Sequence, residues 1–188
     1  MTAYDLPTSL TIGEVEHPIR YGWRAVLDII DGLNQPDFDE QMKMEAMVQI
    51  LYPKWREIPY KDLQEAIEKA CDFIDCGEKP DGKKKPKTVD WKQDAQLIIS
   101  AVNHVANREV RLDPNIHWWT FYSWYMSIEG GLFSVVLSIR KKRAERKKLE
   151  KWEEKFYREN KHIIEFATPE SEKIKAEKES ILKWLNAN

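Results

Sequence analysis

The chain has 188 residues, of which 42% are hydrophobic and 33% are charged, and its formal net charge is −2. This length suits one domain with a core of ordinary size and an appended tail. The total charge conceals an asymmetry, because residues 1–78 carry 7 Lys and Arg against 16 Asp and Glu, whereas residues 79–188 carry 23 against 16. An acidic first half and a near-neutral total argue against a protein that coats nucleic acid over its whole surface.

Neither a secretory leader nor a membrane span is predicted. Met1 is not followed by a charged and then apolar leader, and no apolar run reaches the roughly 18 residues that a spanning helix needs. Cys71 and Cys76 lie five positions apart on one predicted helix, hence on different faces, without a second pair that would complete a metal site. We interpret them as two buried, reduced thiols, and we expect the protein to act in a reducing cytoplasm.

The first predicted elements are a hairpin and three helices. Leu10 to Tyr21 alternate weakly around Gly13, which predicts a short β-hairpin whose second strand Pro18 keeps at an edge. Apolar residues at helical spacing then predict helices over residues 23–33, 37–51 and 63–74.

The second of these helices has two further features. Asp37 followed by Glu40 predicts a capping box at its start. The helix also contains three methionines, which suit an adaptable binding face, although filling the core is their commoner role.

A lysine-rich segment, residues 78–89, separates the third helix from a fourth. It contains two Pro, a Gly and five Lys and cannot bury enough apolar surface to order itself, which predicts a mobile surface loop. Asp90, with Gln93 at the reciprocal position, predicts the cap of a fourth helix whose inner face runs from Ala95 to Val105.

Residues 115–128 contain six aromatic side chains and predict a central helix. Helical spacing places Trp118, Phe121, Tyr122 and Tyr125 on one stripe, so most of the circumference is apolar and we expect the helix to be buried. The alternative, a platform on which bases stack, requires exposed rings. The sequence marks both ends of the helix, with Asp113 as cap, Pro114 at the first position, and Gly130-Gly131 beyond the last turn.

The spacing predicts one long helix from Leu132 to about Lys161. Residues 140–148 carry seven basic residues and one acidic residue, so we expect this middle part to project into solvent or to meet an acidic partner. Thr168-Pro169-Glu170 then predicts the start of a last helix with a short apolar edge. The two apolar stripes of this C-terminal region are Leu149, Trp152 and Phe156, and Ile181, Leu182, Trp184 and Leu185.

The sequence contains none of the constellations that catalysis needs. It has no zinc-protease helix, glycine-rich phosphate loop, serine-nucleophile elbow or Cys/His cluster, and its four histidines are scattered. Asp90 and Asp94 are explained by the helix macrodipole at the start of a helix. We therefore expect a protein that is not an enzyme and has no cofactor and no metal.

Three motifs carry a family resemblance: Asp90 to Ala95, which includes Asp94; His117-Trp118-Trp119-Thr120-Phe121; and Ile139 to Lys142. In order and spacing the chain resembles, over roughly residues 6–162, the small helical tail assembly chaperones of long-tailed bacteriophages. The resemblance implies a partner, the tape measure protein that sets tail length, and a task, keeping that long helical rod soluble until tube subunits assemble around it. The tail tube protein is a second implied partner, and host cytoplasm the implied location.

We therefore predict a mainly α protein, a bundle of about five to six helices with a small N-terminal β-hairpin and an extended C-terminal helical arm. Residues 1–162 form the helical domain and residues 163–188 the tail. The rival class is a nucleic-acid-binding protein that uses residues 140–148 and lysines 83–87, which the acidic half disfavours. A homo-oligomer in which acidic and basic halves pair is also open. The candidate partner-binding residues are Arg140, Lys141, Lys142, Arg143 and the two apolar stripes.

Overall fold

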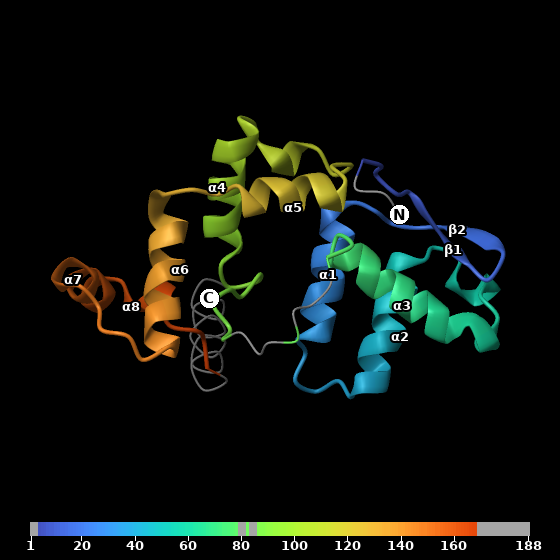
Figure 1. Cartoon of the computed structure of the whole chain (residues 1–188), viewed down its shortest axis with the longest axis horizontal. Coiled ribbons are helices and arrows are strands. Elements are labelled where there is room, and N and C mark those ends of the chain that lie inside the picture. Colours follow the sequence, from blue (N-terminus) through green and yellow to red (C-terminus); the bar gives the residue numbers. More distant parts are fainter. Residues whose placement is uncertain (1–3, 79–81, 83–85, 169–188) are drawn as a thin grey trace, which may run out of the picture.

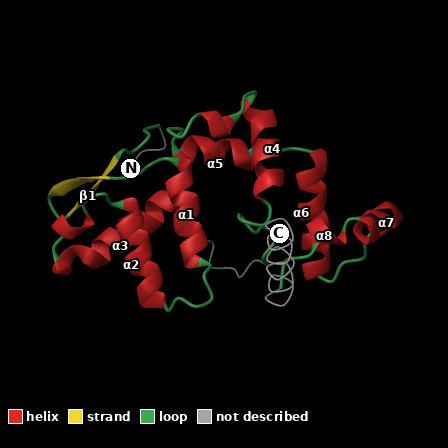
Figure 2. Ribbon diagram, turned by 180° about the vertical axis from the view of Figure 1, so that it is seen from behind, coloured by secondary structure: helices red, strands yellow, loops and turns green. Residues whose placement is uncertain are grey.

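The computed structural model describes residues 4–78, 82 and 86–168, and these residues form a mainly α structure with one N-terminal hairpin (Figures 1 and 2). The fold class predicted from the sequence is confirmed. The described residues contain eight α-helices: α1 (Trp23–Leu33), α2 (Glu40–Leu51), α3 (Leu63–Ile74), α4 (Ala95–Ala106), α5 (Trp118–Met126), α6 (Gly131–Ala144), α7 (Lys151–Glu159) and α8 (Lys161–Ile164). Single 3-10 turns occupy Trp55–Glu57, Tyr60–Asp62 and Val110–Leu112.

The hairpin forms where the alternation predicts it, from β1 (Ser9–Ile12) and β2 (Val15–Pro18). Gly13 makes the turn with a φ of 60°, a conformation that favours glycine. The backbone N–H of Gly13 donates a hydrogen bond to Glu65 on α3, which attaches the hairpin to the helices. Leu10 and Ile12 point inward and are buried, so one face of the hairpin covers the core.

Three predicted helix starts are displaced, although the helices themselves form. The cap of α2 is Asp39, whose carboxylate accepts a hydrogen bond from the Met42 N–H at 2.7 Å, so the predicted box at Asp37 is wrong. Asp90 accepts hydrogen bonds from the N–H groups of Lys92 and Gln93, but this closes a turn that precedes α4. Each true start depends on the φ and ψ angles of the cap residue, which spacing alone does not fix.

The start of α5 is also later than predicted, and its cap is a histidine. His117 has an extended backbone, and its Nδ1 accepts a hydrogen bond from the Trp119 N–H at 3.1 Å. Asp113 instead accepts one from the Asn115 N–H, within the turn before the helix.

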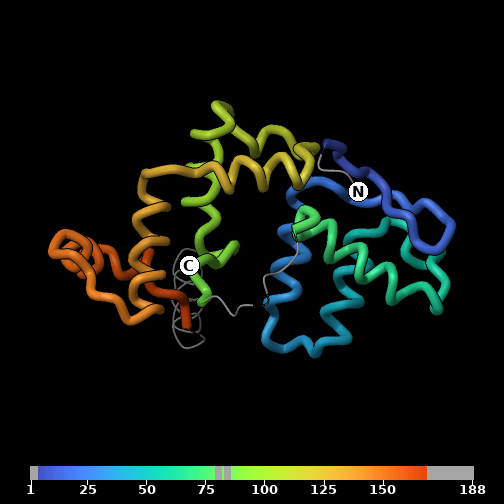
Figure 3. The backbone as a smooth tube through the Cα atoms, in the orientation of Figure 1, coloured from blue at the N-terminus to red at the C-terminus, as the bar shows by residue number. Residues whose placement is uncertain are grey.

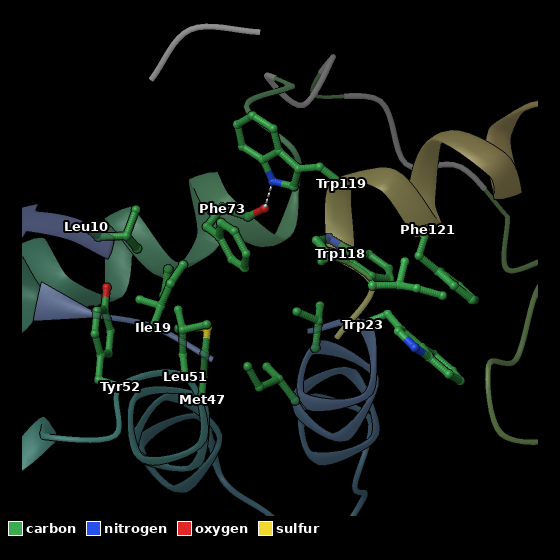
Figure 4. Packing of buried hydrophobic residues seen from close by; sticks show 14 of the residues in the cluster. Leu10, Ile19, Trp23, Met47, Leu51, Tyr52, Phe73, Trp118, Trp119 and Phe121 are labelled. Atoms are coloured by element: carbon green, nitrogen blue, oxygen red, sulfur yellow. Dashed lines mark hydrogen bonds between the residues drawn. The ribbon is translucent and has the colours of Figure 1, made fainter. Parts of the chain in front are cut away.

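Helix α5 lies across the molecule and connects the α1 side to the α4 side, as the tube in Figure 3 shows. Trp118 and Phe121 are buried at 1% and 0% exposure, which confirms the central position predicted for this helix, and Tyr125 is half-buried. The two indoles also satisfy backbone acceptors at the end of α3. Trp118 Nε1 donates to the Ile74 carbonyl at 2.8 Å. Trp119 Nε1 donates to the Phe73 carbonyl, also at 2.8 Å (Figure 4). Both carbonyls belong to the last turn of α3, where no N–H four positions further on donates to them, and the Phe73 carbonyl also accepts from the Cys76 N–H at 3.1 Å.

A backbone bridge joins the start of α1 to the start of α5. The Trp118 N–H donates to the Tyr21 carbonyl at 2.8 Å, and the Trp23 N–H donates to the Ile116 carbonyl at 3.1 Å. Gly22 lies between them, and a Cβ atom there would be 3.1 Å from the Pro114 carbonyl oxygen. This close approach of two backbones explains the glycine.

The long helix predicted from Leu132 to Lys161 is interrupted. Helix α6 ends at Ala144, Arg146 adopts a left-handed conformation with a φ of 55°, and α7 begins after a capping box between Glu150 and Glu153. The arm therefore turns, and α7 lies at the outer end of the molecule (Figure 1). The left-handed residue ends α6, and the capping box starts α7. These two local conformations break the helix although the Arg and Lys residues of this segment favour helix.

The hydrophobic residues form two cores. The main core joins the hairpin, α1 to α5 and Phe133 of α6. A smaller core consists of Val136, Ile139 and Ile164, with Leu149 and Phe156 packed against it. The boundary that we predicted at residue 162 falls within α8, so residues 163–168 belong to this small core and its surroundings. Most of the predicted tail helix, including residues 181–185, and residues 79–81 and 83–85 of the lysine-rich loop lie outside the described residues.

Candidate binding surfaces

Arg140, predicted to contact a partner, is buried at 5% exposure and has an internal role. Its guanidinium forms a two-pronged ion pair with Asp94 at the start of α4, with Nη1 at 2.6 Å and Nη2 at 2.9 Å from the carboxylate oxygens. The expectation that the basic run lies wholly outside the core is therefore wrong at this position. Sequence reasoning missed the pair because the two residues are 46 positions apart.

The remaining N–H groups of Arg140 donate to main-chain carbonyls. Nε donates to Ile164 at 2.7 Å, and Nη2 donates to Ile163 at 2.8 Å. Nη1 also donates to Thr88 at 3.0 Å, and the ring of Phe166 lies 4.3 Å from the guanidinium carbon. Arg140 thereby attaches the end of α8, and the residues before α4, to α6. All five donors of its guanidinium have acceptors.

The motif residues that carry the family resemblance are mostly interior. Asp94, His117, Trp118, Trp119 and Phe121 are buried, and Ala95 is half-buried at the first position of α4. Their contacts, described above, hold α3, α5 and α6 in place. We assign them a structural role.

The other basic residues of the arm divide into paired and open ones. Lys142 donates to both carboxylate oxygens of Glu153, at 2.6 and 2.8 Å, and Glu153 is 1% exposed. Arg143 lies over the ring of Tyr157, with its guanidinium carbon 3.9 Å from the ring centre. Lys141 is exposed on the same helix. Arg140, Lys142 and Arg143 of the basic run therefore have partners within the chain, whereas Lys141 is exposed.

The predicted apolar stripe of Leu149, Trp152 and Phe156 also contains both packed and exposed residues. Leu149 and Phe156 pack against the small core, whereas Trp152 is 52% exposed. The indole of Trp152 donates to Glu150 at 2.8 Å, and exposed Lys155 and Glu159, three and seven positions further on, lie on the same side of the helix. The stripe expected at residues 181–185 lies outside the described residues.

A groove between α2 and α3 is a second surface, which sequence reasoning did not place. It encloses about 830 Å³. Tyr60 lies on its lining and is 90% exposed. The apolar lining comes from α2, the following turns and α3: Met44, Val48, Trp55, Leu63 and Ile67. The methionines of α2 were the available signal, since Met44 lines the groove while Met47 is buried in the core.

The groove lies in the acidic part of the chain. Glu40 and Glu45 line it and are exposed, and Lys61 is the one basic residue among the described lining residues. Residues 37–78 carry 11 Asp and Glu against 5 Lys and Arg. Such a surface favours an apolar ligand with positive charges at its flanks.

The thiols and other metal-capable groups do not gather at either surface. Cys71 is exposed and Cys76 half-buried, and both are free, so the prediction of two buried thiols is wrong for Cys71, which lies on the outer side of α3. Burial raises the pKa of the Cys76 thiol to about 12. Across the described residues no three His, Cys, Asp or Glu side chains are arranged to hold a metal ion.

In the same part of the chain, no helix has the length and apolar character needed to cross a membrane.

Fold and surfaces together define a small, mainly α-helical protein with an acidic, apolar groove at one end and a basic helical arm at the other. The family described as "Bacteriophage Gp15 protein" matches residues 3–166, and the chain therefore belongs to this family of bacteriophage proteins. The match agrees with the bacteriophage resemblance seen in the sequence over residues 6–162. No curated protein and no solved structure matches the chain.

Proposed function

We propose that this bacteriophage protein is a non-enzymatic tail assembly chaperone. It binds the tape measure protein in the host cytoplasm, keeps it soluble, and releases it when tail tube subunits assemble around it. The observation that carries the proposal is the open apolar groove between α2 and α3 in a member of a bacteriophage family.

The groove suits a helical client. An amphipathic helix binds a groove through apolar residues at positions i, i+3, i+4 and i+7, and Met44, Val48 and Ile67 offer apolar contacts along two adjacent helices. Methionine adapts its shape to different partners, which suits binding to a long helical client. A groove that stays open in the isolated chain is available for reversible binding.

Co-expression with the tape measure protein of the same gene cluster tests the proposal. We expect the wild-type chain to copurify with the client and to raise its soluble yield. Met44→Lys places a charge on the groove lining and should remove most of this gain. Met42→Lys is the matched control, since Met42 lies on the same helix, is 45% exposed and does not line the groove. The proposal fails if the wild-type chain neither copurifies with the client nor increases its soluble amount.

Nucleic-acid binding remains the rival function because Arg146, Lys147 and Lys148 are exposed. The internal pairs of Arg140 and Lys142 reduce the number of phosphates that the arm can neutralise. A gel shift with duplex and single-stranded DNA at about 0.1 M salt separates the two functions. Micromolar binding that weakens steeply with salt would favour the rival.

A further inference from the structure

Two exposed surfaces of this chain have opposite charge and lie at opposite ends of its longest axis. The α2–α3 groove is in the acidic segment, residues 37–78, which has 11 acidic and 5 basic residues. The arm, residues 140–161, has 11 basic and 5 acidic residues. Figures 1 and 2 place α7 at one end of the molecule and α2 and α3 at the other.

The arm presents an exposed apolar group next to a basic run, because residues 140–148 carry seven basic residues and one acidic residue, whereas α7 itself carries three of each sign. Trp152 is 52% exposed, its indole N–H donates to Glu150, and Lys155 lies three positions further on α7. The groove offers apolar contacts from Met44 and Trp55 and negative charge from Glu40 and Glu45. Glu154 and Glu159 are the exposed acidic residues of α7. Glu159 forms an ion pair with Lys155, with 3.9 Å between Lys155 Nζ and Glu159 Oε1.

We propose that the Trp152 face of α7 docks in the α2–α3 groove of a second copy of this chain. Within one molecule the small core and the Arg140–Asp94 pair hold the arm at the far end, so α7 does not reach its own groove. The contact is therefore between chains and runs head to tail. Because each copy keeps one free groove and one free arm, such a contact continues into a ring or an open chain.

Sedimentation of the full chain at concentrations from about 1 to about 100 µM tests the contact. The wild-type mass should rise above the monomer value of 22.3 kDa as concentration increases. Trp152→Glu and Met44→Lys should each remain monomeric. Raising the salt to about 1 M, where the screening length falls to about 3 Å, should also shift the wild-type chain toward monomer.

Mixing the two variants gives the sharpest result. Met44→Lys retains its arm and Trp152→Glu retains its groove, so an equimolar mixture should form a one-to-one dimer and nothing larger. Met42→Lys and Met126→Glu, which change exposed residues outside both surfaces, should assemble as the wild type does. Glu40→Lys combined with Glu45→Lys tests the groove through exposed residues if Met44→Lys does not fold.

The outcomes are distinguishable from those of the chaperone test. A wild-type chain that stays monomeric up to about 100 µM, or variants that still assemble, would overturn the docking of α7. Loss of assembly on removal of residues 169–188, with Trp152→Glu unaffected, would assign the contact to another segment and also overturn it. Client solubility with Trp152→Glu, whose groove is intact, reports on the chaperone proposal alone.

Discussion

The ion pair between Arg140 and Asp94 places a full positive and a full negative charge in the interior, with side chains 3% and 1% exposed. Burial of charges is tolerated when each one is paired and hydrogen-bonded. Both conditions are met here, because the guanidinium has five acceptors and Asp94 also accepts a hydrogen bond from the Asp90 N–H at 2.9 Å.

We expect Arg140→Met to lower the free energy of unfolding by about 3–5 kcal/mol, because it leaves the Asp94 carboxylate buried without its partner. Urea unfolding monitored by circular dichroism measures the loss. Lys141→Met, at the exposed neighbouring position, is the control and should change the free energy by no more than about 0.5 kcal/mol.

Replacing both partners extends this test. Arg140→Met combined with Asp94→Leu should be more stable than Arg140→Met alone, since no unpaired charge is then buried. Equal stabilities for the single and double variants would show that the cost does not arise from the unpaired carboxylate.

His117 is a second interior residue whose protonation affects the fold. Its Nδ1 accepts from the Trp119 N–H, and its Nε2 lies 2.9 Å from the Pro7 carbonyl, which fixes the neutral form with the proton on Nε2. Burial lowers the pKa of His117 from its ordinary value of 6.5, although the Pro7 hydrogen bond acts in the opposite direction.

This direction predicts a loss of stability at acidic pH. Below about pH 6.5 the unfolded chain takes up a proton at this position before the folded chain does, so the free energy of unfolding falls as the pH is lowered toward the depressed value. Above about pH 6.5 the contribution is constant. Urea unfolding between about pH 5 and 7.5 should show a weaker pH dependence for His117→Asn than for the wild type or for His162→Gln, which changes an exposed histidine.

At the scale of elements, local spacing predicted most helices because each buries one stripe of its own sequence. The stripe of α1 and the aromatic stripe of α5 are examples, with Trp23, Trp118 and Phe121 buried as expected. The starts of α2, α4 and α5 were displaced because several Asp or His side chains near each start can accept the same N–H groups. The exposed Trp152 belongs to a stripe that spacing predicted, whereas the groove could not be derived from spacing because it needs α2 and α3 side by side.

The end of α6 was missed for a different reason. Arg and Lys are good helix formers, so residues 140–148 give no local signal for a break. The break depends on the left-handed conformation of Arg146 and on the capping box of Glu150 and Glu153.

Arg146→Gly should therefore stabilise the chain. A side chain in the left-handed region costs about 1–2 kcal/mol, whereas glycine adopts this conformation without that cost. After the greater flexibility of glycine in the unfolded chain is subtracted, we expect a gain of about 0.5–1 kcal/mol. Arg146→Val should lower the stability, and thermal unfolding of the three chains gives the order; a less stable glycine variant would contradict the assigned turn.

At the scale of the whole molecule, the two cores differ in size and should differ in local stability. Among the residues that the structure describes, the main core includes 23 buried residues and the small core 3. Segments with few buried apolar contacts open at lower free energy than the global unfolding transition. Arg140 links α6 to α8 and to the start of α4, and Ile164 of α8 packs in the small core.

Hydrogen exchange should resolve this difference. Amides of α7 and α8 should exchange faster than those of α1, α4 and α5, and Arg140→Met should accelerate α8 far more than α1. Uniform protection along the whole chain would mean that the two cores unfold as one unit.

The backbone bridge between Gly22 and His117 has a consequence for the order in which the chain folds. It joins residues separated by about 95 positions, and closing so long a loop costs conformational entropy before any contact compensates for it. During synthesis, residues 4–78 leave the ribosome long before α5 exists. Until then the carbonyls of Phe73 and Ile74 lack their indole donors, and Trp23 lacks the ring of Phe121, which later stacks on it at 4.7 Å. The core around the acidic half of the protein is therefore complete only after α5 has been synthesised. An N-terminal fragment that ends before α5 would leave apolar core residues exposed to solvent.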